Sequence, residues 1–533
     1  MFSAISVADL QKQINSMPPI DVVKLLKNYQ RTTSIDIKQA VDDFVFEDLQ
    51  TKLKTNGINS YCPACDSARV VGFGYNGKIR RFKCKDCNKT FTLFTNTILE
   101  KTKYGWDVWV KMVEMVLNNI PMLSVQETLK KDFGLDDINY KTVFTWRHKI
   151  LHAMAEMPMP KLSGVVQVDE TFFRETQKGS RCLESTIKDE EREPRYGYVP
   201  SHYGNMGNEF ANCVVAINHK GYAVSKVIGL GRLTPDIFFD AFDEYLDNPT
   251  FLCTDANSVY NKYCSLRKIP HYVKPSTYLD TLGQAGYVFG AKDEKTRLRN
   301  RKIERELYKH KKIDYIKNSY MTFEDFKVVK NANSLSLARV NQFHGELKIV
   351  LEVDTRGVST KYLQDYIGAH TYLHNWKVNN GHAPKSNKDA ETILIELLKG
   401  KTIYTAKDIE DAKLDTPKAS GQYMAELKAK TEKIRELTRN KYFKFEKEDN
   451  VYSFDKRKFL EDTPEYKLQK LYRKYKLPTA WTRSSKISAL LKQETIWDDI
   501  LVLISENKRC PITEEDLKAI EAERYKHTPT LGS

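Results

Sequence analysis

Residues 164–173 read GVVQVDETFF, an apolar run with Asp169 near its end. Its β-branched and aromatic residues predict a strand that is buried on both faces. A second apolar run, FLCTD at residues 251–255, ends in Asp255. Successive side chains of a strand point to opposite faces, so only one of Asp169 and Glu170 can share a site with Asp255.

The segments around these two runs predict the rest of a sheet. Residues 212–224 and 225–231 read as strands with a turn at residues 219–221, and HYVKP at 271–275 reads as one more strand. Residues 234–246 predict a helix with Thr234 as its cap and Pro235 at its first position. Three strands, a helix, a strand, a helix and a strand resemble the order of an RNase H-like domain, in which acids at the ends of adjacent central strands meet.

Residues 334–352 predict an amphipathic helix that contains RVNQFHGELK at 339–348. Asn341, His344 and Lys348 are spaced by three and four residues, so they share one face. Glu346 lies about 140° around the helix from Asn341, and Glu352 lies about 16 Å further along the axis. An amide therefore stands where a third acid would complete a metal site.

Two strand-borne carboxylates and an amide suit a particular chemistry. Phosphoryl transfer with two Mg²⁺ ions needs oxygen ligands, and a neutral amide oxygen is an acceptable though weaker one. Two interpretations stay open: a metal site with an amide in it, or a disabled site. Asp255 alone is explained equally well as a turn residue or as a cap for the helix that follows it.

The stretch CPACDSARVVGFGYNGKIRRFKCKDC spans residues 62–87. It contains two Cys-x-x-Cys pairs, and each pair can offer two sulfurs to one tetrahedral Zn²⁺. Residues 70–77 and 78–84 predict two short strands between the pairs, with a turn at residues 75–77. The spacing predicts a zinc ribbon with the ligands Cys62, Cys65, Cys84 and Cys87.

The remaining five of the nine cysteines are scattered, which is typical of a reducing compartment rather than a disulfide scaffold. Residues 106–154 then predict helices. Ser124 and Glu127 have the spacing of a capping box, which predicts a helix start at Ser124, and Gly134 should end that helix. A second helix should bury Val143, Trp146 and Ile150. This pattern favours a helix-turn-helix as much as an ordinary helical hairpin.

Length and charge limit the kinds of protein that this chain can be. A chain of 533 residues is too long to fold around one hydrophobic core and is long enough for three or four domains. No apolar run approaches the roughly 18 residues of a membrane span, and the polar N-terminus predicts an intracellular, cytoplasmic protein. The formal net charge of +15 favours a polyanionic partner, although charge alone does not separate nucleic acid from an acidic membrane or protein.

Taken together, these motifs resemble a known family. The ribbon with a trailing Phe91, the helix ending Lys-Thr-Val-x-x-Trp, the VDETFF strand, the N-x-x-H-x-x-L-K helix and RGVSTKYLQDY occur in this order between about residues 61 and 376. The chain resembles bacterial insertion-sequence transposases of the DDE superfamily, in the ISXO2-like branch where asparagine replaces the third acid.

The resemblance implies a catalytic set and its ligands. It assigns two Mg²⁺ ions (or Mn²⁺) to Asp169, Asp255 and Asn341, and a trailing base to Lys348. His344 is a candidate proton shuttle, hydrogen-bond donor or phosphate contact. Structural Zn²⁺ would occupy the ribbon, and no small-molecule substrate or membrane is implied.

The resemblance also implies double-stranded DNA as the partner, both as transposon ends and as target, and a homodimer or higher oligomer on that DNA. Basic and polar residues of the ribbon, of the second helix and of the later segments are the candidate contacts. The candidates are Lys78, Arg80, Arg81, Lys83, Lys141, Thr145, Arg147, Lys149, Lys348 and Arg356. Those on the second helix are expected to be largely exposed.

The predicted organisation is multidomain α+β. A helical region at 1–57 precedes the ribbon at 58–100, the helix-turn-helix at 103–158 and an RNase H-like catalytic domain at 162–380. That domain contains an insertion at 276–331, in which residues 292–318 hold eleven Lys and Arg against five Asp and Glu, predicting a basic helical arm. A helical region at 381–533 suits accessory DNA binding or dimerisation, with two short helices joined across residues 477–479.

The expected function is therefore DNA strand cleavage and strand transfer. Two alternatives stay open at this point: a non-catalytic DNA-binding regulator descended from a transposase, and an RNase H-like structure-selective nuclease.

Overall fold

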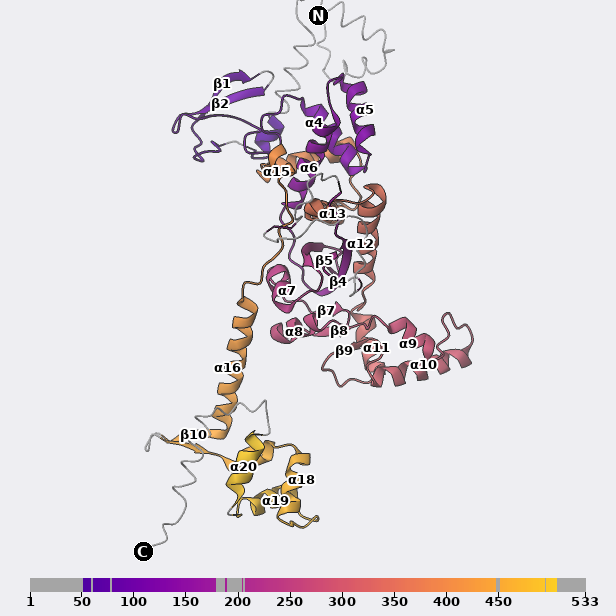
Figure 1. Ribbon diagram of the computed structural model, residues 1–533, viewed down its shortest axis with the longest axis vertical. Coiled ribbons are helices and arrows are strands. Elements are labelled where there is room, and N and C mark those ends of the chain that lie inside the picture. The colour runs from indigo at the N-terminus through magenta and orange to yellow at the C-terminus, as the bar shows by residue number, and fades with distance from the viewer. Residues whose placement is uncertain are drawn as a thin grey trace, which may run out of the picture. The chain divides into compact units, whose positions relative to one another are not determined.

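The computed structural model describes residues 51–58, 61–76, 79–178, 187–188, 204, 207–446, 451–493 and 495–505 (Figure 1). The chain divides into two compact units, Met1–Lys418 and Ala419–Ser533, and each is treated by itself. Among the described residues, no helix combines the length and the apolar character needed to cross a bilayer.

The four cysteines that were predicted to bind zinc lie in or close to the strands of a small antiparallel sheet. Strand β1 (Val70–Asn76) pairs with β2 (Ile79–Cys84), and β2 pairs with β3 (Thr90–Thr92). The two predicted strands are confirmed, whereas β3 was missed because three residues are too few for a periodic pattern. Gly77 of the predicted turn and Lys78 lie outside the described residues.

Three helices follow the ribbon: α4 (Trp106–Leu117), α5 (Met122–Phe133) and α6 (Tyr140–Ala155). The predicted start of α5 at Ser124 is wrong, because the helix begins at Met122 directly after Pro121. A proline fixes φ and has no N–H to satisfy, so it can precede a helix without a capping box. The predicted end is confirmed, since Gly134 adopts the left-handed conformation with φ 65°.

A six-stranded mixed sheet lies at the centre of the first unit. Its strands are β4 (Val165–Arg174), β5 (Phe210–Asn218), β6 (Ala223–Leu230), β7 (Phe251–Thr254), β8 (His271–Val273) and β9 (Tyr315–Ile316). They lie in the order β6-β5-β4-β7-β8-β9. Strand β5 is antiparallel to β4 and β6, whereas β7 is parallel to β4 and β8. Parallel pairing brings the C-terminal ends of β4 and β7 to the same region of the sheet.

Helices flank this sheet, as expected for an α+β protein. Helix α7 (Pro235–Phe242) starts after the predicted cap Thr234, and α8 (Ser258–Arg267) follows β7. Helices α12 (Ala338–Lys348) and α13 (Leu363–Asn380) come later in the chain. Figure 1 shows α7 and α8 on one side of β4 and α12 on the other. Because successive side chains of a strand point to opposite faces, β4 can contact both helix layers.

The insertion before α12 is helical, as predicted. It forms α9 (Tyr278–Gln284), α10 (Glu294–Lys309) and α11 (Phe323–Ala332), and between α10 and α11 it also contributes the edge strand β9, which was not predicted (Figure 1). Tyr308 stacks on Phe326 with ring centroids 4.9 Å apart, which joins α10 to α11. The opposite side of α10 exposes Lys295 and Lys302.

The first unit also includes the beginning of the predicted 381–533 region. Helices α14 (Asn387–Lys399) and α15 (Ala406–Glu410) precede its end at Lys418. Trp106 of α4 donates from Nε1 to Oε1 of Glu391 on α14 over 3.1 Å. Residues 387–399 therefore pack with the helices that follow the ribbon.

The second unit is mostly helical and has its own core. It comprises α16 (Gln422–Tyr442), the hairpin β10 (Phe443–Glu446) with β11 (Val451–Phe454), α17 (Lys456–Asp462), α18 (Glu465–Lys474), α19 (Arg483–Leu490) and α20 (Ile496–Ser505). The predicted pair of short helices is confirmed as α18 and α19. Leu468, Ile487 and Ile500 are almost fully buried in a core of this unit.

Candidate metal and nucleic-acid sites

The cysteine cluster has the geometry that the spacing predicted. The sulfurs of Cys62 and Cys87 lie 3.5 Å apart, those of Cys65 and Cys84 lie 3.6 Å apart, and all four fall within 4.8 Å of one another. Backbone N–H groups of Cys87 and Asp86 lower the pKa of Cys84 to about 6, whereas hydrogen bonds with the neighbouring sulfurs and burial raise the pKa of Cys65 to about 12, so the four thiol groups do not ionise independently. A thiolate is the form that binds zinc, so this donor set fits a structural Zn²⁺ ion.

The basic residues of the ribbon gather around an exposed aromatic ring. The guanidinium of Arg81 lies 5.5 Å from the ring centre of Phe73, and Nζ of Lys83 lies 5.4 Å from it. Phe73 keeps 47% of its surface exposed. Arg80 lies over the ring of Phe82 instead, at 5.9 Å. The sequence analysis missed Phe73, although its position opposite the basic strand was visible in the spacing.

Helix α6 presents fewer free groups than predicted. Lys141 is exposed and Thr145 is half-buried. Arg147 is 7% exposed and donates from Nη1 to the carbonyl of Ile120 over 3.3 Å, so the prediction that its side chain is free is wrong. Lys149 is half-buried, and burial lowers its pKa.

The difference arises because α6 is covered on more than one side. Besides its contact with α5, it packs against α13, where His152 Nδ1 lies 2.9 Å from Asp365 Oδ1. Gly368 of α13 lies so close to Ala155 that a Cβ on the glycine would meet the Ala155 Cβ at 2.5 Å. The 3.6-residue pattern showed one apolar face, whereas the tertiary structure buries a second face that contains polar residues.

Asp169 faces α12, where it meets a histidine. Its Oδ2 lies 3.9 Å from Nδ1 of His344. Burial, together with the nearby charges of Asp255 and Glu170, raises the pKa of Asp169 to about 7, while Lys348 acts in the opposite direction. Two further carboxyl groups therefore lie close enough to Asp169 to disfavour its ionisation.

Asp255 follows β7 and is also held in a defined position. Its Oδ1 accepts a hydrogen bond of 2.9 Å from the backbone N–H of Asn257, and burial raises its pKa. The cap of α8 is Asn257, whose side chain accepts from the N–H of Val259. Asp255 is therefore not the cap of α8, but its bond to the N–H two residues on is that of a turn residue, so this alternative agrees with the structure.

Glu170 faces the other helix layer, as strand alternation predicted. Its Oε1 accepts from Nδ2 of Asn257 over 2.8 Å and from the hydroxyl of Tyr260 over 3.2 Å. Its Oε2 accepts from Nδ2 of Asn212 over 2.7 Å. Glu170 therefore ties β4 to β5 and to the start of α8, a role that the sequence analysis did not assign.

The face of α12 that was predicted to meet the acids does so at His344 and Lys348. His344 is 8% exposed, and burial together with Lys348 lowers its pKa to about 4. Its Nε2 is buried and has no hydrogen-bond partner among the described residues. Lys348 is exposed. Asn341 is exposed on the same helix, three residues before His344.

Glu346 points away from this face, as the helix geometry predicted. Its Oε1 accepts from Gln342 Nε2 over 2.9 Å, and its Oε2 lies 4.0 Å from His374 of α13. The chain continues past α12 in a π-helical segment, Ile349–Asp354. Arg356 follows with φ 54° and an exposed side chain, while its carbonyl accepts from Lys178 Nζ over 2.6 Å.

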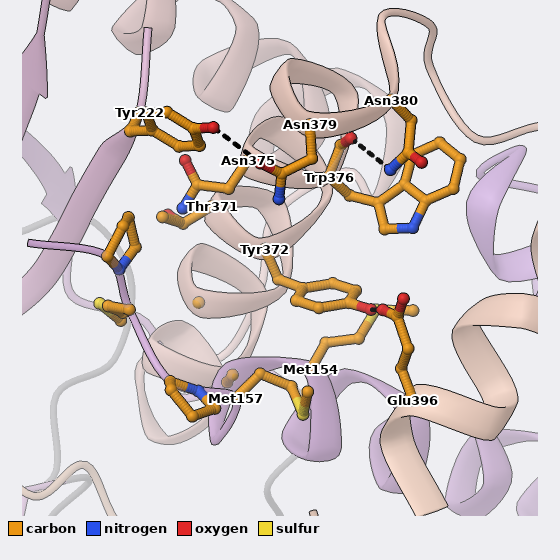
Figure 2. Close-up of a pocket in the computed structure, with 15 residues that line it drawn as sticks. Met154, Met157, Tyr222, Thr371, Tyr372, Asn375, Trp376, Asn379, Asn380 and Glu396 are labelled. Atoms are coloured by element: carbon orange, nitrogen blue, oxygen red, sulfur yellow. Dashed lines mark hydrogen bonds between the residues drawn. The ribbon is translucent and has the colours of Figure 1, made fainter. Parts of the chain in front are cut away.

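A cavity of about 390 Å³ lies apart from these acids (Figure 2). Its lining comes from the end of α6, from α13 and from α14. Two pairs of its polar side chains are bonded to each other: Tyr372 donates to Glu396 over 2.5 Å and Tyr222 donates to Asn379 over 2.8 Å. None of the predicted site residues lines this cavity.

Comparisons with known proteins point to mobile elements. The chain is 29% identical over 124 residues to an uncharacterized protein in transposable element ISH50 of Halobacterium salinarum, covering 23% of this chain and 39% of that protein. It is 38% identical over 74 residues to the insertion element iso-IS1N protein InsA of Shigella dysenteriae, covering 14% of this chain and 78% of InsA. The chain thus spans about two fifths of the first relative. No protein-family model matches it.

Proposed function

We propose that this chain, which belongs to the family of insertion-element proteins that includes InsA, is a DNA transposase of the DDE superfamily. The observation that carries the proposal is the acid pair. Asp169 lies on β4 and Asp255 directly follows the parallel strand β7, Asp255 raises the pKa of Asp169, and His344 lies 3.9 Å from Asp169. The strand order β6-β5-β4-β7-β8 supports an RNase H-like catalytic domain.

The donor set suits magnesium. Asp169, Asp255 and Asn341 would hold two Mg²⁺ ions, or Mn²⁺ in their place, because these cations prefer carboxylate and amide oxygens. When bound, the ions supply Lewis-acid activation of water and then of the freed 3′-hydroxyl for in-line attack on a phosphate. The mutual opposition of the buried acids supports the fit, since it would be relieved by positive charge.

The side chains of α12 would act on the DNA itself. Lys348 is exposed beside Asp169 and would contact the scissile phosphate. His344 has a pKa of about 4, so its ring is neutral near pH 7 and keeps an unprotonated nitrogen. The neutral ring has one N–H donor and one acceptor nitrogen, so it can form a hydrogen bond with the attacking hydroxyl group or with a phosphate oxygen.

The ribbon and the helices after it would recognise the terminal inverted repeats of the element. Arg81 and Lys83 around the exposed ring of Phe73 suit phosphate contacts beside a stacking surface. Lys141 on α6 and the basic face of α10 would extend the contact to further phosphates. Two ends must be joined, so the active species on DNA would contain at least two copies of the chain.

Purified protein with end-containing DNA and Mg²⁺ tests the proposal. Strand transfer of the cleaved end supports it. Binding without cleavage would point to a regulator, and cleavage that ignores the end sequence would point to a structure-selective nuclease. Asp169→Ala should abolish cleavage while leaving end binding intact, and persistence of cleavage in this variant would overturn the assignment.

Asn341→Ala tests the amide ligand in the same assay. We expect cleavage to fall by roughly 10- to 100-fold and to require more Mg²⁺, since one oxygen ligand is removed. Wild-type activity in this variant would remove Asn341 from the site and leave the two aspartates as the only protein ligands of the proposal.

A further inference from the structure

The helix that carries Asn341, His344 and Lys348 begins without a cap of its own. The residue before α12 is Leu337, whose side chain makes no bond to the helix, while Ser336 Oγ accepts from the first N–H, that of Ala338, over 3.4 Å. The second and third N–H groups of a helix need an acceptor, which a Ser, Thr, Asp or Asn at the cap position usually supplies. In α12 these groups belong to Arg339 and Val340.

A side chain from the central sheet supplies the missing acceptor. Oε1 of Gln167 accepts from the N–H of Arg339 over 2.9 Å and from the N–H of Val340 over 3.3 Å. Its Nε2 donates to Oγ of Ser336 over 3.3 Å. Gln167 is 4% exposed, so these bonds form away from water. The amide of Gln167 therefore performs, from β4, the work of a local cap.

Gln167 lies on the same strand as Asp169, so the cap also affects how α12 lies relative to that acid. Gln167 and Asp169 are two residues apart and thus face the same helix layer. Two strand residues span roughly 6.6 Å, and the four helical residues from Val340 to His344 span about 6 Å. The Gln167–Val340 and Asp169–His344 contacts are thus matched in spacing, which keeps α12 alongside β4.

We propose that Gln167 is a positioning residue of the active site. By capping α12 from β4, it fixes how far Asn341, His344 and Lys348 stand from Asp169. The inference rests on the proposed function, because it concerns the same acids. It assigns Gln167 no contact with DNA or metal.

Two substitutions separate the cap from the bulk of the side chain. Gln167→Met keeps the volume and removes the acceptor, which leaves two buried N–H groups without a partner. Gln167→Glu keeps an acceptor that also suits the positive end of a helix. We expect Gln167→Met to lower Mg²⁺-dependent cleavage by roughly 10- to 100-fold, as loss of a supporting contact does, and Gln167→Glu to restore most of it.

Thr171→Val is the matched control. Thr171 lies on the same face of β4 and is 3% exposed, but its hydroxyl has no hydrogen-bond partner among the described residues. We expect this variant to cleave like the wild type. End-DNA affinity should be unchanged in all three variants, because the ribbon and α6 are untouched.

Backbone hydrogen exchange across residues 338–341 reports the cap without any catalysis. Faster exchange in Gln167→Met but not in Thr171→Val, together with a raised Mg²⁺ requirement, supports the inference. Wild-type cleavage and exchange in Gln167→Met would overturn it. Equal losses in Gln167→Met and Gln167→Glu would also overturn it, since both keep the volume and the acceptor would then not be what matters. A wild-type protein that never cleaves contradicts the proposed function, while the exchange result still stands.

Discussion

Asp169 is the residue whose chemistry departs most clearly from its ordinary behaviour. Its pKa rises from 3.8 to about 7 because it is buried near two other acids. Keeping such a group charged is unfavourable without a cation, and active sites often contain this kind of arrangement. The raised pKa of Asp169 therefore connects the proposed metal site with the pH dependence of the free energy of unfolding.

A stability measurement can test that link. A pKa raised on folding contributes stability that is complete below about pH 4 and is lost as the pH rises through about 7. We expect Asp169→Asn, in the absence of Mg²⁺, to be more stable than the wild type at pH 8 by roughly 2 to 4 kcal/mol, and equally stable near pH 3. Denaturant unfolding of the central sheet at the two pH values, with zinc removed by a chelator at both, checks this. An equal effect at both would contradict it.

Mg²⁺ should stabilise the folded protein, because its positive charge offsets the repulsion between the buried carboxylates. A ligand that binds only the folded state stabilises it by mass action. At pH 8 we expect Mg²⁺ to raise the unfolding midpoint of the wild type and to leave that of Asp169→Asn almost unchanged. Thermal unfolding with and without Mg²⁺ measures the difference, and an equal rise in both proteins would place the Mg²⁺ effect elsewhere.

At the scale of elements, α6 shows how a basic helix can differ from its sequence pattern. Lys141 is exposed, whereas Arg147 is buried and bonded to the carbonyl of Ile120. Two cations of one helix should therefore respond differently to alanine. One belongs to a surface that DNA can reach, and the other to the packing between α5 and α6.

We expect Lys141→Ala to weaken end-DNA binding and to reduce the salt dependence of the binding constant by about one counterion. Arg147→Ala should leave the salt dependence unchanged and lower the free energy of unfolding by about 1 to 3 kcal/mol, because a buried hydrogen bond is lost. Titrations at several salt concentrations, with unfolding curves for both variants, decide between the two roles. A reduced salt slope in Arg147→Ala would contradict the buried assignment.

The ribbon is the second element with a testable dependence. Its core depends on four thiol groups around one point, and such small metal sites fold with their ion. We expect a strong zinc chelator, or Cys84→Ser, to melt β1 to β3 and to abolish end-specific binding while leaving the central sheet folded. Circular dichroism, zinc content and DNA binding measured together check this. End binding that is indifferent to chelation would contradict a DNA-reading ribbon.

For the whole molecule, the division at Lys418 is the main feature. Helix α14 belongs to the first unit, while Leu468, Ile487 and Ile500 belong to a separate core. A fragment of residues 1–418 should therefore fold and keep the proposed Mg²⁺-dependent cleavage. Its unfolding transition should match the one that the Asp169 variants shift in the full chain. Aggregation of this fragment would mean that the two units fold together.

The features that depend on local spacing could be predicted before the fold was known. Two Cys-x-x-Cys pairs, the apolar runs ending at Asp169 and Asp255, and the shared face of His344 and Lys348 follow from knuckle geometry and from the periods of strand and helix. Only the tertiary structure decided that Arg147 is buried and that Gln167 caps α12. Those contacts join residues that are far apart in the chain, 172 positions in the case of Gln167 and Arg339. No local period encodes such a pair, because its partners meet only when the sheet and the helices have packed.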